Sequence, residues 1–530
     1  MKDEGSPRES SAMTRSLILY PLSLILSTAV VLVPVGCGKT ASKEESPPPK
    51  TNVIDGPSKK ADFTALRPKI KAFCGACHMV PDPATFPKRA WYDEVALGYR
   101  LYDESNRHDL SPPPMSDVVA YYRHFAPEQL ALPKVVQTDG SARATFETRQ
   151  VRLPAGIEVA GVSHLFPHSL PGSKRELLLC DMRIGEVRRV NPADPQLKAE
   201  LLAKLHNPAH IEPVDFGNGG RRDYVVAELG TFLPADHDKG RITWLRARND
   251  GAGYDAIVLK AGLARVADVR PADFDGDGKL DLIVAEFGWR KTGRILLLKQ
   301  TGSKDGVPQF QTIEVDKRHG TIHVPVVDLN KDGRPDFIAL VSQEHEAIDA
   351  FLNKGDGAVE RKRIFEANDP SYGSSGIEVV DLDGDGDLDV VYTNGDSLDS
   401  HYLKPYHAVH WLENRGTFPF THHELTRLPG ASRAIAVDLD GDGDLDIACA
   451  AYLPPSIINE QAGGKIDSLI WLEQREEGQF VRHGIERSAT GYLSLVAGDF
   501  DGDGAPDLAA GHFQKSAGGN WVTLWLTRRK

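Results

Sequence analysis

Cys74 and Cys77 are separated by two residues, and His78 follows directly, in the order Cys-Gly-Ala-Cys-His. Two thiols at this spacing can hold a haem through thioether bonds, and the adjacent imidazole can ligate its iron. The thiols alone would also suit half of a zinc site or a redox dithiol. The chain has no second Cys-x-x-Cys to complete a four-cysteine zinc site. The motif therefore predicts one covalent haem c.

The ligand on the second face of the iron is left open by the sequence. Met79 adjoins His78 and can hardly reach the opposite face. Met115, at the end of a proline-rich segment, is the best candidate, and His108 and His124 are alternatives. Methionine or histidine ligation favours electron transfer, whereas an open position favours small-molecule binding or peroxide chemistry.

An acidic pattern, Asp-x-Asp-x-Asp-Gly-x-x-Asp, forms the second chemically informative group and occurs five times. Oxygen atoms from positions 1, 3, 5, 7 and 9 would form a cage of the kind that Ca²⁺ prefers, so we expect up to five calcium ions. The alternative is a set of acidic turns that water solvates. The expected ligands are Asp273, Asp275, Asp277, Asp281, Asp328, Asn330, Asp332, Asp336, Asp381, Asp383, Asp385, Asp389, Asp438, Asp440, Asp442, Asp446, Asp499, Asp501, Asp503 and Asp507.

These loops belong to a longer repeat, because their first residues lie 53 to 61 positions apart. A decayed copy spans Asp215–Asp223 and lacks carboxylates at positions 3 and 5, and a further unit lies at His168–Glu176. Six of the seven units read as four short strands and the seventh lacks its fourth, with the acidic loop between the first two. Regular repetition of four strands predicts an all-β, seven-bladed propeller. An unmatched strand at Phe146–Val151 is expected to complete the last blade and so remove an open sheet edge.

The five complete loops resemble the FG-GAP/VCBS repeat family, and the similarity covers residues 145–530. This resemblance implies a calcium-binding propeller, usually outside the cytoplasm and often used for binding or adhesion. Residues 61–131 are similar to cytochrome c domains through Cys74, Cys77 and His78. The resemblance implies a small all-α haem domain, joined to the propeller by a linker at 132–144.

The N-terminal region has the layout of an export signal. Arg15 precedes an apolar stretch, Leu17–Val35, which ends shortly before Cys37. That end resembles a bacterial lipobox with Cys37 as the lipidated residue, although Pro34 stands where the motif usually has leucine. Residues 1–37 are thus a signal peptide and lipobox; a cleaved ordinary signal and a retained helix are the alternatives. Residues 38–60 read as a flexible tether, and Met1 and Met13 are both possible starts.

The charge composition argues against one class of binding partner, nucleic acid. The 530 residues carry a formal net charge of -13, so there is no basic surplus to neutralise phosphates, and we expect no nucleic-acid partner. Cys180 and Cys449 each lie in an apolar run and are expected to be buried free thiols. In the helical unit, Ser116 is expected to cap one helix, and another is expected around Trp91.

A binding face is expected opposite the acidic loops, where the long variable loops must lie. Its best single candidate is the insertion Asn394–His407. Residues five positions before successive acidic loops should meet near the mouth of the central channel on that face: His210, Asp268, His323, Gly376, Arg433 and Ser494. The alternative is that these polar groups are only solvated.

Together these features predict an exported, membrane-anchored lipoprotein facing the periplasm or the cell surface. Its expected function is electron transfer by a c-type cytochrome, with the propeller docking a redox partner protein, an extracellular polymer or a substrate. Whether the chain is itself an enzyme is left open. The alternatives are an oxidoreductase whose propeller oxidises an organic substrate and passes electrons to haem, and an adhesion protein.

Overall fold

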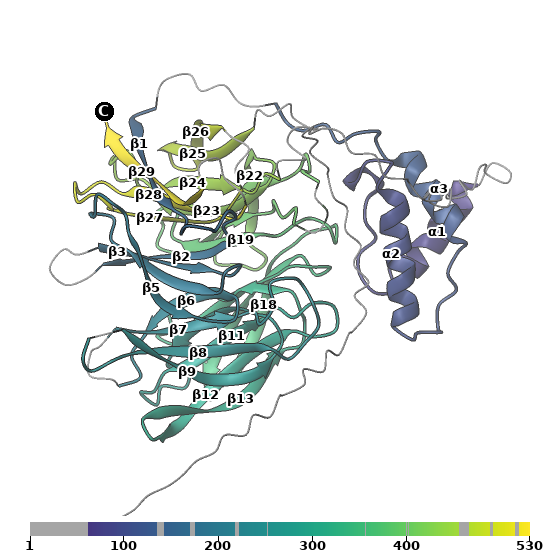
Figure 1. Cartoon of the computed structure of the whole chain (residues 1–530). Helices are drawn as coiled ribbons and strands as arrows, with labels where there is room; N and C mark the ends of the chain where they lie inside the picture. Colours follow the sequence, from purple (N-terminus) through teal and green to yellow (C-terminus); the bar gives the residue numbers. More distant parts are fainter. Residues whose placement is uncertain are drawn as a thin grey trace, which may run out of the picture. The chain divides into compact units, whose positions relative to one another are not determined.

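The repeated strand–loop–strand pattern forms seven antiparallel sheets in a computed structural model of the chain (Figure 1). The structure describes residues 62–134, 142–169, 175–217, 222–251, 253–355, 357–398, 400, 402–454, 466–487, 491–514 and 519–530. The predicted export signal, the lipidated Cys37 and the tether lie outside these residues.

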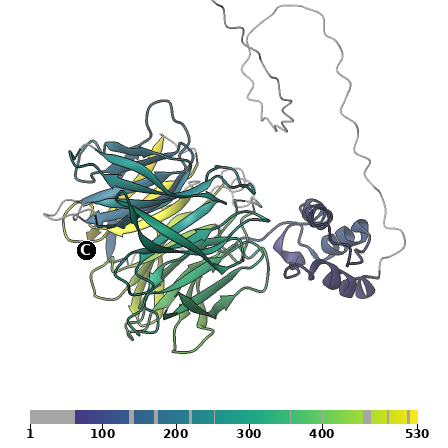
Figure 2. The same cartoon turned by 90° about the horizontal axis from the view of Figure 1, so that it is seen from below.

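The helices precede all the strands in the described part of the chain, and Figure 2 shows them grouped apart from the sheets. They are α1 (Phe63–Cys74), a short 3-10 helix (Pro83–Thr85), α2 (Trp91–Glu104) and α3 (Met115–Phe125). Asp62 caps α1, because its Oδ1 accepts hydrogen bonds from the first-turn amides. Trp91 stacks on Tyr122 at 4.0 Å between ring centroids and so joins α2 to α3. Within the described residues, no helix is both long and apolar enough to cross a membrane.

Ser116 does not cap a helix, so that prediction was wrong. Helix α3 begins one residue earlier, at Met115, and Pro114 is its N-cap, with no side-chain cap hydrogen bond. The run of prolines before Met115 holds the backbone extended, and the helix begins as soon as the run ends. The expected helix around Trp91 is confirmed as α2.

Seven sheets form the blades, and each is numbered here in chain order. Blades 1 to 3 are β2–β5 (Val162–Ser169, Arg175–Asp181, Glu186–Val190, Ala199–Lys204), β6–β9 (Pro208–Val214, Asp223–Glu228, Gly240–Ala247, Tyr254–Leu263) and β10–β13 (Val266–Ala272, Asp281–Glu286, Arg294–Lys304, Val307–Asp316). Blades 4 and 5 are β14–β18 (Thr321–His323, Val326–Val327, Asp336–Val341, Ala347–Gly355, Ala358–Glu366) and β19–β22 (Gly376–Val380, Asp389–Thr393, Ala408–Glu413, Thr421–Arg427). Blades 6 and 7 are β23–β26 (Ala431–Val437, Asp446–Ala451, Asp467–Glu476, Gln479–Arg487) and β27–β29 (Tyr492–Gly498, Asp507–His512, Asn520–Arg529) with β1 (Ala144–Arg152).

Ring closure is confirmed in blade 7. Strand β1 pairs antiparallel with β29, so that Ala144 lies opposite Arg529 and Thr148 opposite Trp525. The first strand of the propeller therefore covers the edge of the last blade, which would otherwise be open. The innermost strands of neighbouring blades contact one another all the way round, from β2 through β27 and back to β2.

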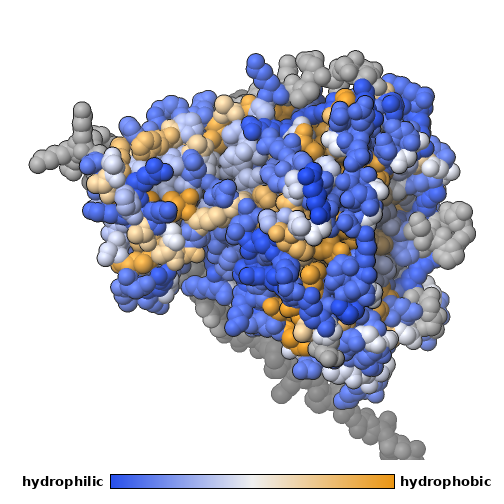
Figure 3. Space-filling model, turned by 180° about the vertical axis from the view of Figure 1, so that it is seen from behind, coloured by the Kyte–Doolittle hydropathy of each residue, from blue (hydrophilic) through white to orange (hydrophobic). Residues whose placement is uncertain are grey.

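The apolar cores lie between blades. For example, Trp244 of blade 2 packs with Val284 of blade 3, and Trp471 of blade 6 packs with Trp525 of blade 7. The second strand of each blade is buried on both faces, which explains its unbroken apolar sequence. Hydrophilic side chains cover most of the face drawn in Figure 3, with small apolar groups between them.

The buried thiols confirm another expectation. Cys180 on β3 and Cys449 on β24 are free cysteines with 0% exposure. Burial raises the pKa of both thiols, so neither is a reactive thiolate at neutral pH.

Candidate functional site

The first candidate site is the Cys-x-x-Cys-His segment, which starts at the last residue of α1. Cys74 is half-buried and packs against the helical core, whereas Cys77 is exposed. Between them the chain turns sharply at Gly75, where a Cβ would lie 2.4 Å from the carbonyl oxygen of Lys71. Only glycine fits this turn, which keeps both thiols on one short segment.

His78 is exposed and oriented by its neighbour. Its Nδ1 lies 2.6 Å from the carbonyl oxygen of Met79, so Nδ1 must carry the proton that is donated. The neutral ring then has its lone pair on Nε2, the form that can ligate a metal. Burial and the neighbouring Cys77 raise the pKa of Cys74 to about 11, so this thiol is protonated at neutral pH. The donor set of one exposed thiol, one half-buried thiol and one oriented imidazole fits covalent haem.

Met115 is connected to this segment through Tyr99. The hydroxyl group of Tyr99 donates to the carbonyl oxygen of Pro113 at 2.5 Å, and its ring lies 5.1 Å from that of Phe73. The proline-rich segment that ends at Met115 is therefore held beside the end of α1. His124 instead lies at the far end of α3, with its ring 4.9 Å from that of Phe63.

Arg107 is a residue of this site that the sequence analysis missed. Its Nη1 lies 3.3 Å from the carbonyl oxygen of Ala76 and 3.1 Å from the Sγ of Cys77. An ion pair with Asp109 at 2.7 Å holds the guanidinium in place. The two residues flank His108, which places that alternative ligand in the neighbourhood of Cys77 as well.

The acidic loops form the second candidate site, and their side chains turn inward. In the loop of blade 3, Asp273 accepts a hydrogen bond from the Gly278 amide at 2.8 Å, and Asp275 accepts one from Asp277 at 3.2 Å. Oxygen atoms of three carboxylates lie within 4.8 Å of one another in this loop, and also in the loops of blades 5 and 6. Such a cluster of hard oxygen donors can hold a cation such as Ca²⁺.

The last aspartate of each loop has a structural task that the pattern did not reveal. In blade 6, the buried Asp446 accepts hydrogen bonds from the Leu439 amide at 3.0 Å and the Gln474 amide at 2.8 Å. It thus joins the loop to the third strand, and burial raises its pKa to about 7. The decayed loop keeps this contact: Asp223 accepts from the Ala247 amide at 2.8 Å and from the Trp244 indole at 3.1 Å.

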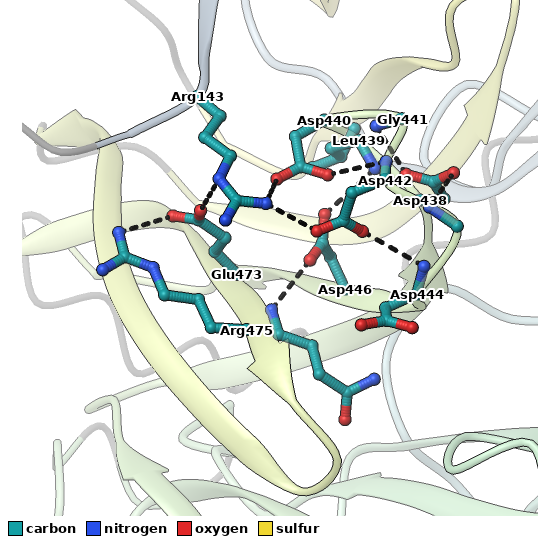
Figure 4. Close-up of polar contacts among 12 residues, drawn as sticks. Arg143, Asp438, Leu439, Asp440, Gly441, Asp442, Asp444, Asp446, Glu473 and Arg475 are labelled. Atoms are coloured by element: carbon teal, nitrogen blue, oxygen red, sulfur yellow. Dashed lines mark hydrogen bonds and ion pairs between the residues drawn. The ribbon is translucent and has the colours of Figure 1, made fainter.

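Basic side chains partly neutralise the loops, as Figure 4 shows for blade 6. Arg143 lies just before β1, and its guanidinium contacts Asp442 at 2.6 Å, Asp440 at 3.3 Å and Glu473 at 3.2 Å. The acidic loop of blade 6 therefore also anchors the segment that enters the closing strand β1. The sequence alone gave no signal for this contact, because about 300 residues separate its partners.

Three of the six predicted channel residues, His210, Asp268 and His323, meet as the register predicted. The Nε2 of His210 on β6 lies 3.2 Å from Asp268 of β10, and the Nδ1 of His323 on β14 lies 3.8 Å from the same carboxylate. Arg433 instead pairs with Glu378 on β19 at 3.0 Å. Gly376 and Ser494 hold the equivalent positions on β19 and β27.

The insertion Asn394–His407 contacts the helical unit of the same chain. Tyr402 packs against the helical core, and its hydroxyl lies 3.3 Å from the Nε of Arg89. The ammonium of Lys404, which is 2% exposed, lies 4.8 Å from the centre of the Phe86 ring. The sequence marked this insertion as a binding surface; the structure shows that part of it binds this chain's own helices.

The family comparison agrees with the blade pattern, because a model of FG-GAP-like repeats matches residues 205–284 and 328–392. The chain carries FG-GAP-like repeats. The matched segments fall in blades 2 and 3 and in blades 4 and 5 of the propeller.

Two curated relatives are similar to part of this chain. A T-cell immunomodulatory protein homolog of Plasmodium falciparum is 22% identical over 284 residues, which cover 48% of this chain and 38% of that protein. Cartilage acidic protein 1 of Homo sapiens is 25% identical over 225 residues, which cover 39% of this chain and 33% of that protein. The chain thus spans only 33–38% of the length of these relatives.

Among solved structures, virginiamycin B lyase from Staphylococcus aureus is similar with a TM-score of 0.43 and 11% identity. The similarity covers 72% of this chain and 99% of the lyase.

Proposed function

We propose that the chain is an exported c-type cytochrome for electron transfer, in which a small haem-carrying helical unit is joined to a calcium-stabilised FG-GAP-like propeller. The observation that carries the proposal is the geometry of the Cys74–His78 segment. Its two thiols, one half-buried and one exposed, lie on one turn, and the contact with Met79 leaves the His78 Nε2 able to ligate a metal.

Each residue has a distinct role in this proposal. Cys74 and Cys77 would hold the haem through thioether bonds, His78 would ligate the iron, and Met115 is the candidate ligand for the second face. The bound haem supplies one-electron chemistry. Arg107, held beside Cys77, adds a positive charge that disfavours the oxidised, more positive form of the site.

The propeller supplies structure and a binding surface. Up to five Ca²⁺ ions in the acidic loops would offset the carboxylate repulsion that the basic side chains neutralise only in part. The face opposite these loops contacts the helical unit through the Asn394–His407 insertion. Its other loops would dock a redox partner protein, an extracellular polymer or a substrate. Lipidation at Cys37 would tether the assembly to a membrane facing the periplasm or the outside.

An optical spectrum tests the redox proposal. The exported full-length protein should give a pyridine haemochrome of c type and be reduced reversibly. Replacing both Cys74 and Cys77 with serine should abolish covalent haem attachment, whereas Cys180→Ala, which removes a buried thiol far from the motif in sequence, should retain it. A purified wild-type protein without covalent haem, made in a host that matures c-type cytochromes, would contradict the proposal.

A further inference from the structure

Two loops on the face opposite the acidic loops bring together a histidine–glutamate–histidine cluster, His319, Glu344 and His345. His319 lies between β13 and β14, and the other two lie between β16 and β17. The His319 Nε2 is 3.0 Å from the Glu344 Oε2, and the two imidazole rings are 5.3 Å apart between centroids. One ligand atom from each residue lies within 4.8 Å of the others.

The backbone is strained on both sides of Glu344 and His345. Gln343 and Glu346, on either side, have φ values of 59° and 41°, which are costly for residues with a Cβ. Hydrogen bonds hold the turn at both ends: the Ser342 amide donates to the Gly320 carbonyl at 2.8 Å, and the Glu346 carboxylate accepts from the Ser374 amide at 2.9 Å. Backbone strain of this kind concentrates at functional sites.

Close backbone packing at Gly293 and Gly320 also fixes the loop that carries His319. A Cβ on Gly293 would lie 2.6 Å from the Cβ of His319, and one on Gly320 would lie 2.8 Å from the Ser342 carbonyl oxygen. Both glycines have positive φ, 126° and 85°. The cluster is therefore built on two loops that pack backbone to backbone, which limits how far its side chains can move apart.

The neighbouring arginines are paired with other carboxylates. Arg318 contacts Asp316 at 2.7 Å and Asp349 at 2.6 Å, and Arg363 contacts Asp349 and Glu366, both at 2.6 Å. These pairs offset the positive charge beside the cluster. They leave the Glu344 carboxylate facing His319 and His345 rather than a guanidinium.

The central channel holds a similar set of residues that differs on this point. His164, His210 and Glu212 also bring ligand atoms within 4.8 Å of one another. There, however, the Arg270 guanidinium lies 2.5 Å from the same Glu212 oxygen that His210 contacts. The arginine supplies the positive charge in the channel, so the channel cluster is stabilised without a metal.

We propose that His319, Glu344 and His345 bind a divalent transition-metal ion. Two imidazoles and one carboxylate suit Zn²⁺ or Fe²⁺, and three protein ligands leave a coordination position for an exogenous group. Glu344 and His345 line a cavity of about 250 Å³ whose lining also includes Cys77, His78 and Met79. A small molecule in this cavity can reach the metal from the side that faces the haem-attachment motif.

The test is a titration of full-length protein with Zn²⁺ in excess Ca²⁺, which keeps the acidic loops saturated. Calorimetry should show one Zn²⁺ bound per chain, and Co²⁺ should give a d–d spectrum without a thiolate charge-transfer band. Glu344→Gln and His345→Ala should each weaken binding by about tenfold or more. His206→Ala, which removes a histidine with a 61% exposed side chain near Glu228, is the matched control and should bind as the wild type does.

Three results would overturn the metal site. The first is the absence of stoichiometric Zn²⁺ and Co²⁺ binding to the wild type in excess Ca²⁺. The second is binding that persists in both cluster variants. The third is binding that disappears in Cys77→Ser, which would assign the metal to the thiols. Glu344→Gln keeps the volume of the side chain, and an unchanged melting temperature without metal will show that its effect is not one of folding. This test of the metal site does not depend on the outcome of the haem-attachment test.

Discussion

The Asp369 carboxylate of the propeller accepts a hydrogen bond from the backbone amide of Asp82, 2.8 Å away and 287 positions earlier in the chain. The same oxygen accepts a second bond from the hydroxyl group of Thr85 at 2.9 Å. One carboxylate oxygen thus joins the helical unit to the segment between blades 4 and 5.

Asp369→Ala should loosen the helical unit without unfolding the propeller. The Thr85 side chain is 2% exposed, and it would lose its charged acceptor, at a cost of about 1.5–3 kcal/mol. Hydrogen exchange read by mass spectrometry should show faster exchange across the segment that includes Asp82 and Trp91. The exposed Glu360→Gln is the control. Equal exchange in Asp369→Ala and wild type would show that the contact does not hold the helices.

Calcium removal should destabilise the propeller. Ligand binding to the folded state alone adds about 2.7 kcal/mol per site at a hundredfold excess over the dissociation constant. A chelator should therefore lower the melting temperature of the wild type, and added Ca²⁺ should restore it.

Two neighbouring variants in blade 6 separate calcium binding from general charge effects. Asp442→Asn removes a carboxylate at position 5 and should reduce the calcium-dependent rise in melting temperature. Asp444→Asn changes the charge of the loop equally, but at position 7 only the carbonyl is an expected ligand, so it should keep most of that rise. Equal losses in both variants, or melting that a chelator leaves unchanged, would argue for solvated acidic turns.

Met115→Leu should change the haem spectrum if Met115 is the second axial ligand. The variant should lose the methionine-to-iron charge-transfer band and have a lower reduction potential, because methionine ligation raises the potential. Leucine keeps the volume and the packing, so covalent haem should be retained. A wild type that lacks this band would favour His108, His124 or an open position.

Because His512 is buried, we expect the free energy of unfolding of the protein to fall in mild acid. His512 is 2% exposed, with its Nε2 2.9 Å from the Thr523 hydroxyl, and burial lowers its pKa from 6.5 to about 4. Between these values the unfolded chain binds a proton that the folded chain does not. Stability therefore falls as pH falls, by about 1.4 kcal/mol per pH unit for this one group.

Urea unfolding over this pH range provides the measurement. His512→Gln keeps a polar group beside Thr523 and should give a smaller slope of unfolding free energy against pH than the wild type. A slope that is identical in His512→Gln and wild type would mean that His512 is protonated in the folded state.

Local sequence determined the repeat, the blade number and the closing strand. Each acidic loop is contiguous, and the strands around it have an apolar pattern that burial between two blades requires. The closing strand at Phe146–Val151 could be predicted because the seventh unit lacks a fourth strand, and an open edge is unfavourable. The haem motif is likewise contiguous in sequence, from Cys74 to His78.

Tertiary structure decided which distant groups meet. Arg143 reaches the loop of blade 6, Asp369 binds the helical unit, and His319 meets Glu344 across two loops. No local pattern encodes these contacts, because each depends on how loops of different blades converge on one face after the ring has closed. The sequence thus determines which functional groups each segment carries, and the closed ring determines which of these groups lie close to one another.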